Sequence, residues 1–291
     1  MTDFSFFQVI GTPALNPSGI YLSQRTYYEG GNQADYDLNR FMPGQPWTFE
    51  NPTSVAQIYD DLVWTNVWGN GSNVDVAVDF HTAGAGSFNP LWVYADTRIQ
   101  FVDRMARLAE PDVLKVDEGQ IGTVETTFVQ ADIPAITYEL GEALTWNDAF
   151  IERGFQYNLR LMGDLNMIPT EEVYQPDLSN TYVGKIFQSI PCQYAGFMEL
   201  LVDVLDDVEE GTELARIRNH WGDVLETISS PTVGKVFSLR SDPAIGPGNS
   251  IGSLIYNSTL VPDCEAGCVV SGRKVPTGGD SEGGGVRRRR I

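Results

Sequence analysis

Apolar and polar residues along the first 180 positions form runs that predict strands alternating with helices. Val74–Phe80 and Ile133–Tyr138 are short apolar runs of the kind found in buried strands. Residues 53–63, 98–108 and 146–165 place apolar side chains at helical spacing. This alternation predicts an α/β fold whose sheet is mostly parallel or mixed and has flanking helices. In such a sheet, ligands bind beyond the carboxyl ends of the strands.

The region before the first predicted helix has a different residue pattern. Met1–Val9 is predicted to be a short apolar strand. Gly11–Gly44 is rich in glycine and proline and is predicted to be loop-rich, which is where a scaffold usually displays its binding groups. Substrate-binding residues are therefore expected in this segment.

The pattern changes again near residue 181. From there, short β-like runs are interrupted by turn pairs such as Gly222-Asp223 and Ser230-Pro231. We predict an α/β domain over residues 1–180 and a small all-β domain over residues 181–258. Residues 259–291 are rich in glycine and end in four arginines, which predicts a disordered tail.

Charge limits the classes of partner. The chain has 39 acidic and 19 basic residues and a formal net charge of −20, which opposes binding to nucleic acid or to an anionic membrane. No apolar run reaches the roughly 18 residues that a membrane helix needs, and no basic segment precedes an apolar stretch at the start. We expect neither nucleic acid nor membrane as a partner. The sequence leaves the oligomeric state open, and the compartment too, because a cytoplasmic and a secreted protein both fit.

One histidine stands where a strand is predicted to end. His81 follows the apolar run that includes Val78 and Phe80, and an imidazole at the open end of a buried strand is well placed to bind a metal. A satisfied structural histidine is the alternative. Asp79, two residues earlier, would lie on the same face of the strand and could support the imidazole.

A carboxylate ends the second predicted strand. Glu139 follows Tyr138, and burial there would raise its pKa toward the range of a general base. A solvated loop glutamate is the alternative interpretation, and Glu142 is the second candidate for the base.

Two arginines in the loop-rich segment suit an anionic substrate. Arg40 follows Asn39 and offers a guanidinium fork beside an amide, which fits recognition of a carboxylate. Arg25 could polarise a carbonyl or hold a second anionic group, or could be an ordinary surface arginine.

Together these residues resemble the succinylglutamate desuccinylase/aspartoacylase family of the zinc carboxypeptidase clan, and within it the ectoine-deacetylase-like subgroup. The resemblance covers nearly all of residues 8–256. It rests on four ordered motifs, with Arg25 between the first two: Asn16-Pro17-Ser18-Gly19, Asp37-Leu38-Asn39-Arg40 with Pro43-Gly44, Asp79-Phe80-His81 and Tyr138-Glu139-Leu140-Gly141.

The resemblance implies a zinc-dependent deacylase that cleaves the amide bond of an N-acyl amino acid or a similar small carboxylate. By motif, His81 resembles the last zinc ligand and Glu139 the catalytic acid and base. Asn39 and Arg40 resemble the clamp on the substrate carboxylate, and Arg25 the carbonyl-polarising arginine. The β-rich segment resembles the family's barrel-sandwich domain. That pattern is shared with lipoyl carriers, but the turn over residues 219–226 has no lysine, which argues against a carrier role.

The resemblance also predicts a departure. The family's first two zinc ligands lie in an H-x-x-E turn upstream of the strand before Asn16, and the fifteen residues before Asn16 contain neither histidine nor glutamate. We therefore expect two zinc ligands to be missing, as in an N-terminally truncated enzyme or in a non-catalytic relative that binds carboxylates. A metallocarboxypeptidase acting on peptides is a third hypothesis. His220 does not match the missing position and is predicted to lie on the surface or in the barrel.

Overall fold

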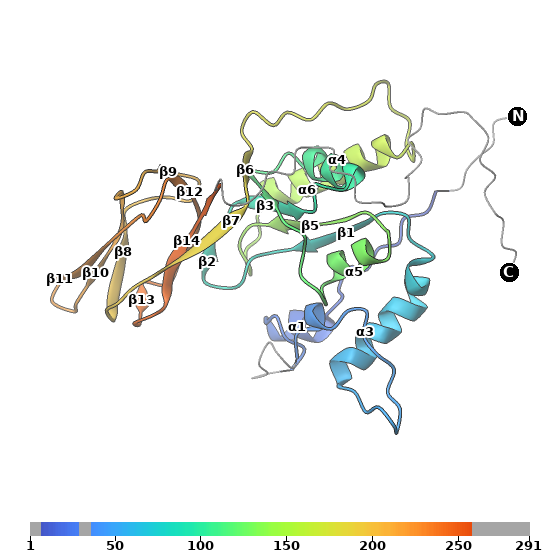
Figure 1. Cartoon of the computed structure of the whole chain (residues 1–291), viewed down its shortest axis with the longest axis horizontal. Coiled ribbons are helices and arrows are strands. Elements are labelled where there is room, and N and C mark those ends of the chain that lie inside the picture. The colour runs from blue at the N-terminus through green and yellow to red at the C-terminus, as the bar shows by residue number, and fades with distance from the viewer. Residues whose placement is uncertain (1–6, 29–35, 258–291) are drawn as a thin grey trace, which may run out of the picture.

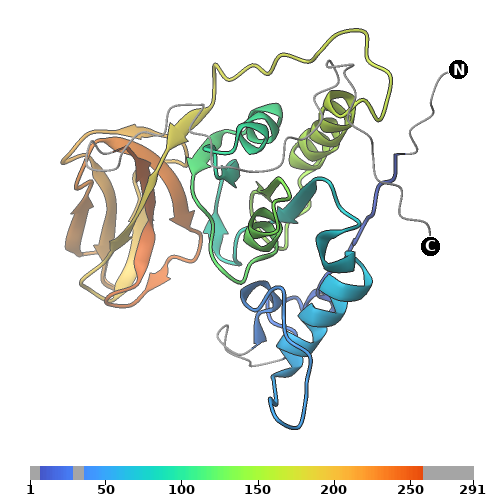
Figure 2. The same cartoon turned by 45° about the vertical axis from the view of Figure 1, so that its right-hand side comes forward.

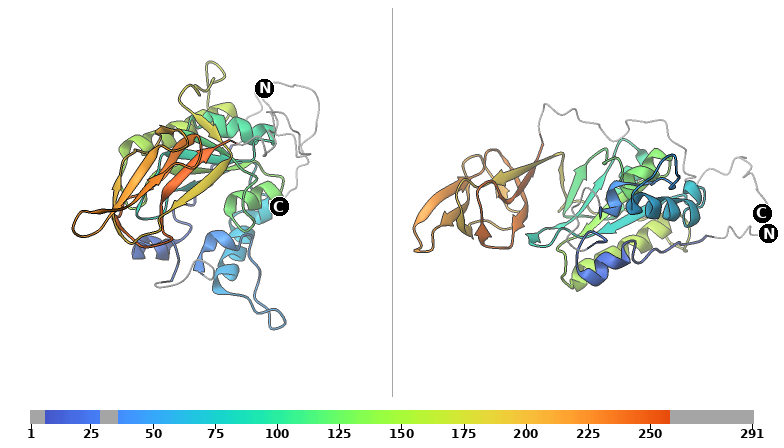
Figure 3. Two further views of the ribbon diagram at one scale, coloured as in Figure 1. Left: turned by 60° about the vertical axis from the view of Figure 1, so that its left-hand side comes forward. Right: turned by 90° about the horizontal axis from the view of Figure 1, so that it is seen from below.

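The computed structural model describes residues 7–28 and 36–257. Within these ranges the α/β part and the β-rich part form two lobes that lie side by side, as Figures 1 and 3 show. The predicted tail beyond residue 258 falls outside the described residues.

A mixed five-stranded sheet forms the centre of the first lobe. Its strand order is β1-β5-β3-β4-β6, and only the β3–β5 pair is antiparallel. The strands are β1 (Ala77–His81), β3 (Leu91–Ala95), β4 (Val113–Val116), β5 (Ala135–Leu140) and β6 (Tyr182–Gly184). The α/β fold with a mostly parallel or mixed sheet is therefore confirmed.

Helices cover both faces of this sheet (Figure 2). Helices α4 and α6 pack on one face, and α5 packs on the other, beside α1 and α3. The helical elements are α1 (Pro17–Leu22), the 3-10 turn η1 (Leu38–Arg40), α3 (Val55–Asn66), the 3-10 turn η2 (Gly69–Gly71), α4 (Gln100–Leu108), α5 (Val124–Gln130) and α6 (Asp148–Asp164).

Helix α3 begins where the sequence places a cap. The Ser54 side chain accepts a hydrogen bond from the Gln57 backbone, and the Gln57 side chain accepts one from the Ser54 backbone. This capping box satisfies two backbone donors that a helix start leaves free. The predicted helix over 53–63 is confirmed.

The two faces of the sheet differ in chemistry. Val78, Ile136 and Tyr138 belong to the apolar cluster under α4 and α6. The Phe80 ring lies on the same face and contacts Tyr138 and Tyr157. The alternate positions on β1 and β5 therefore face α5. Those positions carry the two predicted site residues of the sheet, His81 and Glu139.

The second lobe is a β-sandwich. One sheet has the order β11-β10-β8-β13, and the other β2-β12-β14-β7, with β9 paired to β12. The strands are β2 (Ser87–Phe88), β7 (Ile186–Pro191), β8 (Gly196–Leu200), β9 (Asp207–Val208), β10 (Glu213–Arg218), β11 (Val224–Ser229), β12 (Gly234–Arg240), β13 (Ala244–Ile245) and β14 (Ser250–Tyr256). Because β2 comes from the first half of the chain, the two lobes share a sheet.

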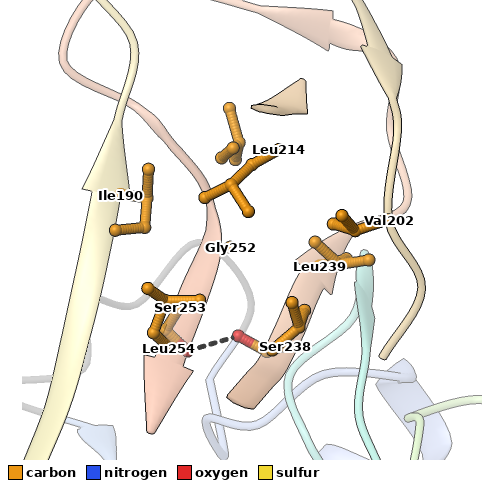
Figure 4. Close-up of a pocket in the computed structure, with 10 residues that line it drawn as sticks. Ile190, Val202, Leu214, Ser238, Leu239, Gly252, Ser253 and Leu254 are labelled. Atoms are coloured by element: carbon orange, nitrogen blue, oxygen red, sulfur yellow. Dashed lines mark hydrogen bonds between the residues drawn. The ribbon is translucent and has the colours of Figure 1, made fainter. Parts of the chain in front are cut away.

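The interior of the sandwich is filled by side chains. Figure 4 shows the space between its sheets, where Leu214, Leu239 and Leu254 converge around a void of about 10 Å³. The hydroxyl oxygens of Ser238 and Ser253 are hydrogen-bonded at 2.6 Å beside this void. The void holds at most about one water, so we assign no ligand site here.

Several element predictions differ from the structure. Of the predicted strand over residues 1–9, residues 1–6 lie outside the described residues. Residues 7–9 are not in a strand, and Phe7 and Val9 are 50% and 69% exposed. The segment 11–44 contains α1 and η1, so it is only partly loop. Strands β3 and β4 and helix α5 were not predicted from the sequence pattern. The first strand after residue 181, β6, joins the sheet of the first lobe by pairing with β4. Within the described residues, no helix has the length and hydropathy to cross a membrane.

Candidate active site

The Asn16-Pro17-Ser18-Gly19 motif fixes the backbone of Arg25. Asn16 caps α1 by accepting a hydrogen bond from the Gly19 amide, and its Nδ2 donates to the Arg25 carbonyl at 2.8 Å. A side chain at position 19 would have its Cβ 2.7 Å from the Gln24 carbonyl oxygen. Glycine is therefore required for the chain to fold back and present Arg25.

Asp37 links the two arginines. Its carboxylate accepts a hydrogen bond from Arg25 Nε at 2.7 Å and lies 4.0 Å from Arg40 Nε. It also caps η1 by accepting from the Asn39 amide, and its side chain is 3% exposed. Sequence reasoning quoted Asp37 within its motif but gave it no role.

Asn39 uses both polar ends of its side chain inside the protein. Its Oδ1 accepts a 2.7 Å hydrogen bond from the amide of Val124, the first residue of α5. Its Nδ2 lies 3.2 Å from His81 Nε2. The side chain thus joins the η1 turn to α5 and to the end of β1, which is a positioning role that the motif did not reveal.

His81 and Glu139 lie side by side on the sheet. They are partners in the parallel β1–β5 register, so their side chains project from the same face of adjacent strands, about 4.8 Å apart. His81 Nε2 also lies 2.8 Å from Asp79 Oδ2. Because Nε2 cannot both donate to Asp79 and accept from Asn39 Nδ2, we assign the proton to Nε2 for the shorter contact to Asp79, and Asn39 Nδ2 is then a neighbour without a hydrogen bond to it. In this tautomer Nδ1 carries the lone pair that could bind a metal.

The local charges set the protonation of this pair. Burial lowers the pKa of His81, but the adjacent Asp79 and Glu139 carboxylates outweigh burial and raise it overall. Burial raises the pKa of the Glu139 carboxyl, while His81 and Arg25 partly oppose the shift. Oxygen Oε2 of Glu139 has no hydrogen-bond partner within the described part of the chain. Such a carboxyl is suited to exchange a proton with a bound molecule.

A single cleft of about 410 Å³ brings the predicted residues together. Arg25, Asn39, Arg40, His81 and Glu139 all line it. They come from α1's following loop, η1, β1 and β5, which are far apart in sequence. Glu142 is not among the lining residues. His220 is exposed at the β10–β11 turn, where its ring contacts Trp221, so the prediction of a surface residue is confirmed.

The rest of the cleft wall was not predicted. It consists of residues from β3, β4 and the loop that leads to α5, namely Trp92, Tyr94, Lys115, Asp117, Gly119, Gln120 and Thr123. The sequence did contain one signal for this wall: Trp92 and Tyr94 are two positions apart, so in a strand their side chains lie on the same face. Recognising it would have required first predicting β3 itself.

The described residues do not gather a complete metal centre. Within 7–28 and 36–257 there is no group of three or more histidine, cysteine, aspartate or glutamate side chains arranged to hold a metal ion. A catalytic zinc usually takes three protein ligands. His81 offers one nitrogen that suits zinc, and Asp79 holds the imidazole rather than binding the metal itself. These two residues alone therefore do not make a catalytic zinc site.

Comparison with known protein families identifies the family of this chain. The succinylglutamate desuccinylase/aspartoacylase catalytic domain matches residues 7–163, more than half of the sequence. The chain belongs to this family. The matched range includes all five predicted site residues and ends inside α6.

Solved structures of the family share the fold. A succinylglutamate desuccinylase/aspartoacylase from Rhodobacter sphaeroides has a TM-score of 0.67 and 17% identity, with 84% of this chain and 74% of that one covered. The product-bound ectoine utilization protein EutE from Ruegeria pomeroyi has a TM-score of 0.67 and 20% identity, over 84% and 73%. A Silicibacter succinylglutamate desuccinylase has a TM-score of 0.63 and 18% identity, over 83% and 73%. Comparison with proteins of curated function gives no match.

Proposed function

We propose that this protein is a deacylase that hydrolyses the amide bond of an N-acyl amino acid or a similar small carboxylate. One observation supports this most directly: a half-buried carboxyl with a raised pKa, Glu139, shares a cleft with two guanidinium groups and a strand-end histidine. Membership of a hydrolase family agrees with this assignment.

In this proposal, Arg40 and Arg25 bind the substrate. A guanidinium fork matches the geometry of a carboxylate, so Arg40 would bind the substrate carboxylate. Arg25 would place positive charge beside the amide carbonyl, where negative charge develops as water adds to the carbon. Asp37 contacts both side chains and would hold them at a fixed separation.

Glu139 supplies the proton transfers. Its carboxylate would take a proton from the attacking water as the oxygen bonds to the amide carbon. The same carboxyl would then give that proton to the amide nitrogen as the carbon–nitrogen bond breaks, releasing a carboxylic acid and an amine. The acid then loses its remaining proton to the amine or to solvent, which leaves a carboxylate. Positioned proton transfer of this kind contributes about 10²–10⁴-fold to rate.

We also propose zinc as the cofactor, with His81 as one ligand through Nδ1. The support is the donor chemistry, an imidazole held by Asp79 at the open end of a strand. Because the described residues do not complete a zinc site, none of the steps above passes through the metal.

The incomplete metal centre favours a second candidate, a non-catalytic module that binds carboxylates. It would use Arg40 and Arg25 in the same way and would need no proton transfer. A peptide-cleaving metallocarboxypeptidase has no observation here that favours it over the two other candidates.

One experiment separates the candidates. The purified chain is supplied with zinc and a panel of N-acetyl amino acids, and free amine release is measured alongside binding by calorimetry. The deacylase proposal expects turnover that falls at least about 10²-fold in Glu139→Gln, with ligand affinity retained, and no such fall in the control Glu142→Gln. Binding that depends on Arg40 without turnover supports the binding module, and absence of both binding and turnover contradicts both proposals.

A further inference from the structure

The cleft continues beyond Glu139 toward the second lobe. Trp92 pairs with Glu139, Tyr94 pairs with Thr137, and Lys115 pairs with Tyr94 in the sheet register. These residues therefore project from one face, and the Lys115 backbone lies two strands, or about 10 Å, from β5. A substrate bound beside Glu139 could span this distance with its side chain or its acyl chain.

An ion pair sits at this far end. Lys115 Nζ contacts the Asp117 carboxylate and lies 4.8 Å from the centre of the Phe187 ring on β7. The Lys115 side chain is only 17% exposed, and burial lowers its pKa. Asp117 also accepts a hydrogen bond from the Gly119 amide at 2.9 Å. Lys115 is thus largely removed from water, whereas the Asp117 side chain is 30% exposed, and both residues line the cleft.

Aromatic rings lie on the Lys115 side of the pair. Trp92, which also lines the cleft, contacts Phe187 and Phe237 of the second lobe at ring-centre distances of 5.5 and 5.0 Å. The second lobe therefore packs against the Trp92 side chain of the cleft wall. The surface there combines aromatic rings with one charge of each sign.

The charges decide which group fits. Asp117 cancels the charge of Lys115, so a second substrate carboxylate would gain little attraction and would meet a like charge. An apolar chain would shield the ion pair from water without replacing its hydrogen bonds, which is costly. A carboxamide is flat and neutral, can accept from the Lys115 ammonium and can donate to the Asp117 carboxylate.

We propose that Lys115 and Asp117 form a specificity subsite for a neutral carboxamide at the distal end of the substrate. This proposal rests on the proposed function, because it assumes that Arg40 holds the other end of the same molecule. It names a substrate class within that function, an acyl amino acid with an amide-bearing side chain or acyl group.

Binding to the full chain tests the proposal through two matched ligand series. The first varies the amino acid: N-acetyl-glutamine, N-acetyl-glutamate and N-acetyl-norleucine. The second varies the acyl group: succinamoyl-alanine, succinyl-alanine and pentanoyl-alanine. In one series the carboxamide should bind at least about tenfold more tightly than its two analogues, as expected for hydrogen bonds to charged groups.

Two variants then test the residues. Lys115→Met should remove the preference for the carboxamide. Asp117→Asn leaves Lys115 with its charge unmatched, so the preference should move toward the carboxylate analogue, a change that a purely structural ion pair would not produce. Lys235→Met is the control, because Lys235 also pairs with a carboxylate, Asp207, and faces a ring, Tyr182, but lies outside the cleft lining. It should retain the wild-type preference.

The outcomes distinguish this proposal from the proposed function. If the ligands bind and Arg40→Ala weakens them, but neither series discriminates, the subsite is wrong and Lys115–Asp117 is a structural pair only. If discrimination survives both Lys115→Met and Asp117→Asn, these residues are not its source and the proposal is also wrong. If no ligand binds to the wild-type chain, the proposed function fails and the subsite fails with it.

Discussion

Nδ2 of Asn39 lies 3.2 Å from Nε2 of His81, although 42 positions separate the two residues. The other end of the same amide accepts from the Val124 backbone at the start of α5. One side chain therefore connects the loop that carries Arg40 to the strand that carries His81. Its amide geometry fixes the separation of the two halves of the candidate site.

Replacing Asn39 should cost stability. Asn39→Ala leaves the buried Val124 amide without its acceptor, so the free energy of unfolding should fall by about 1–3 kcal/mol. Asn39→Asp keeps an oxygen toward Val124 and should lose less. Urea unfolding of the two variants beside the wild type measures the difference. Equal stability of Asn39→Ala and wild type would show that the contact to α5 contributes nothing.

Replacing Asp37 should affect the position of Arg25 and Arg40 more than the stability of the fold. In Asp37→Asn the cap on the Asn39 amide can persist, but the charge that faces Arg25 and Arg40 is lost. We expect weaker binding of N-acetyl amino acids, by about tenfold, because the guanidinium groups are no longer held in place. Calorimetry measures the affinity, and unchanged affinity would remove Asp37 from the site. Asp242→Asn, which alters an arginine partner in the second lobe, is the control.

A side chain at position 122 should destabilise the fold. Its φ is +91°, and a Cβ would lie 2.3 Å from the Arg40 carbonyl oxygen. Gly211 has a similar φ of +88° but open space around its Cβ position. Gly211→Ala should therefore cost only the backbone strain of about 1 kcal/mol, while Gly122→Ala should cost at least about twice that. Gly122→Ala should also weaken ligand binding through Arg40. Similar losses in thermal unfolding for both variants would refute the close approach.

Asp60 should make stability depend on pH. Its side chain is fully buried on α3, and burial together with Asp37 raises its pKa to about 8. The folded-state pKa is above the unfolded one, so folding takes up a proton and the wild-type chain loses stability as pH rises from about 4 to about 8.

Asp60→Asn removes this dependence at the cost of a buried neutral amide. Its stability relative to wild type should increase across that pH interval, by on the order of a few kcal/mol at most. Denaturant unfolding at several pH values provides the measurement, with the partly exposed neighbour in Asp61→Asn as the control. A constant difference between Asp60→Asn and wild type would mean that Asp60 is ionised in the fold.

The sequence determined the elements with strong local signals. Ser54 and Gln57 form the capping box that starts α3, and the apolar runs before His81 and Glu139 became β1 and β5. These predictions depend on neighbours within a few residues, which the sequence contains in full. The motif order also sufficed to identify the family, whose catalytic domain matches residues 7–163.

Only the tertiary structure decided how the cleft is assembled. Which strand lies beside β5, and in which register, depends on pairing across long stretches of chain, so Trp92 and Lys115 could not be placed beside Glu139 from local pattern. The same holds for Asn39, whose contacts to His81 and Val124 join three segments. Hydrophobic periodicity determines which face of an element is buried, but the packing of all elements together determines which polar groups meet on the other face.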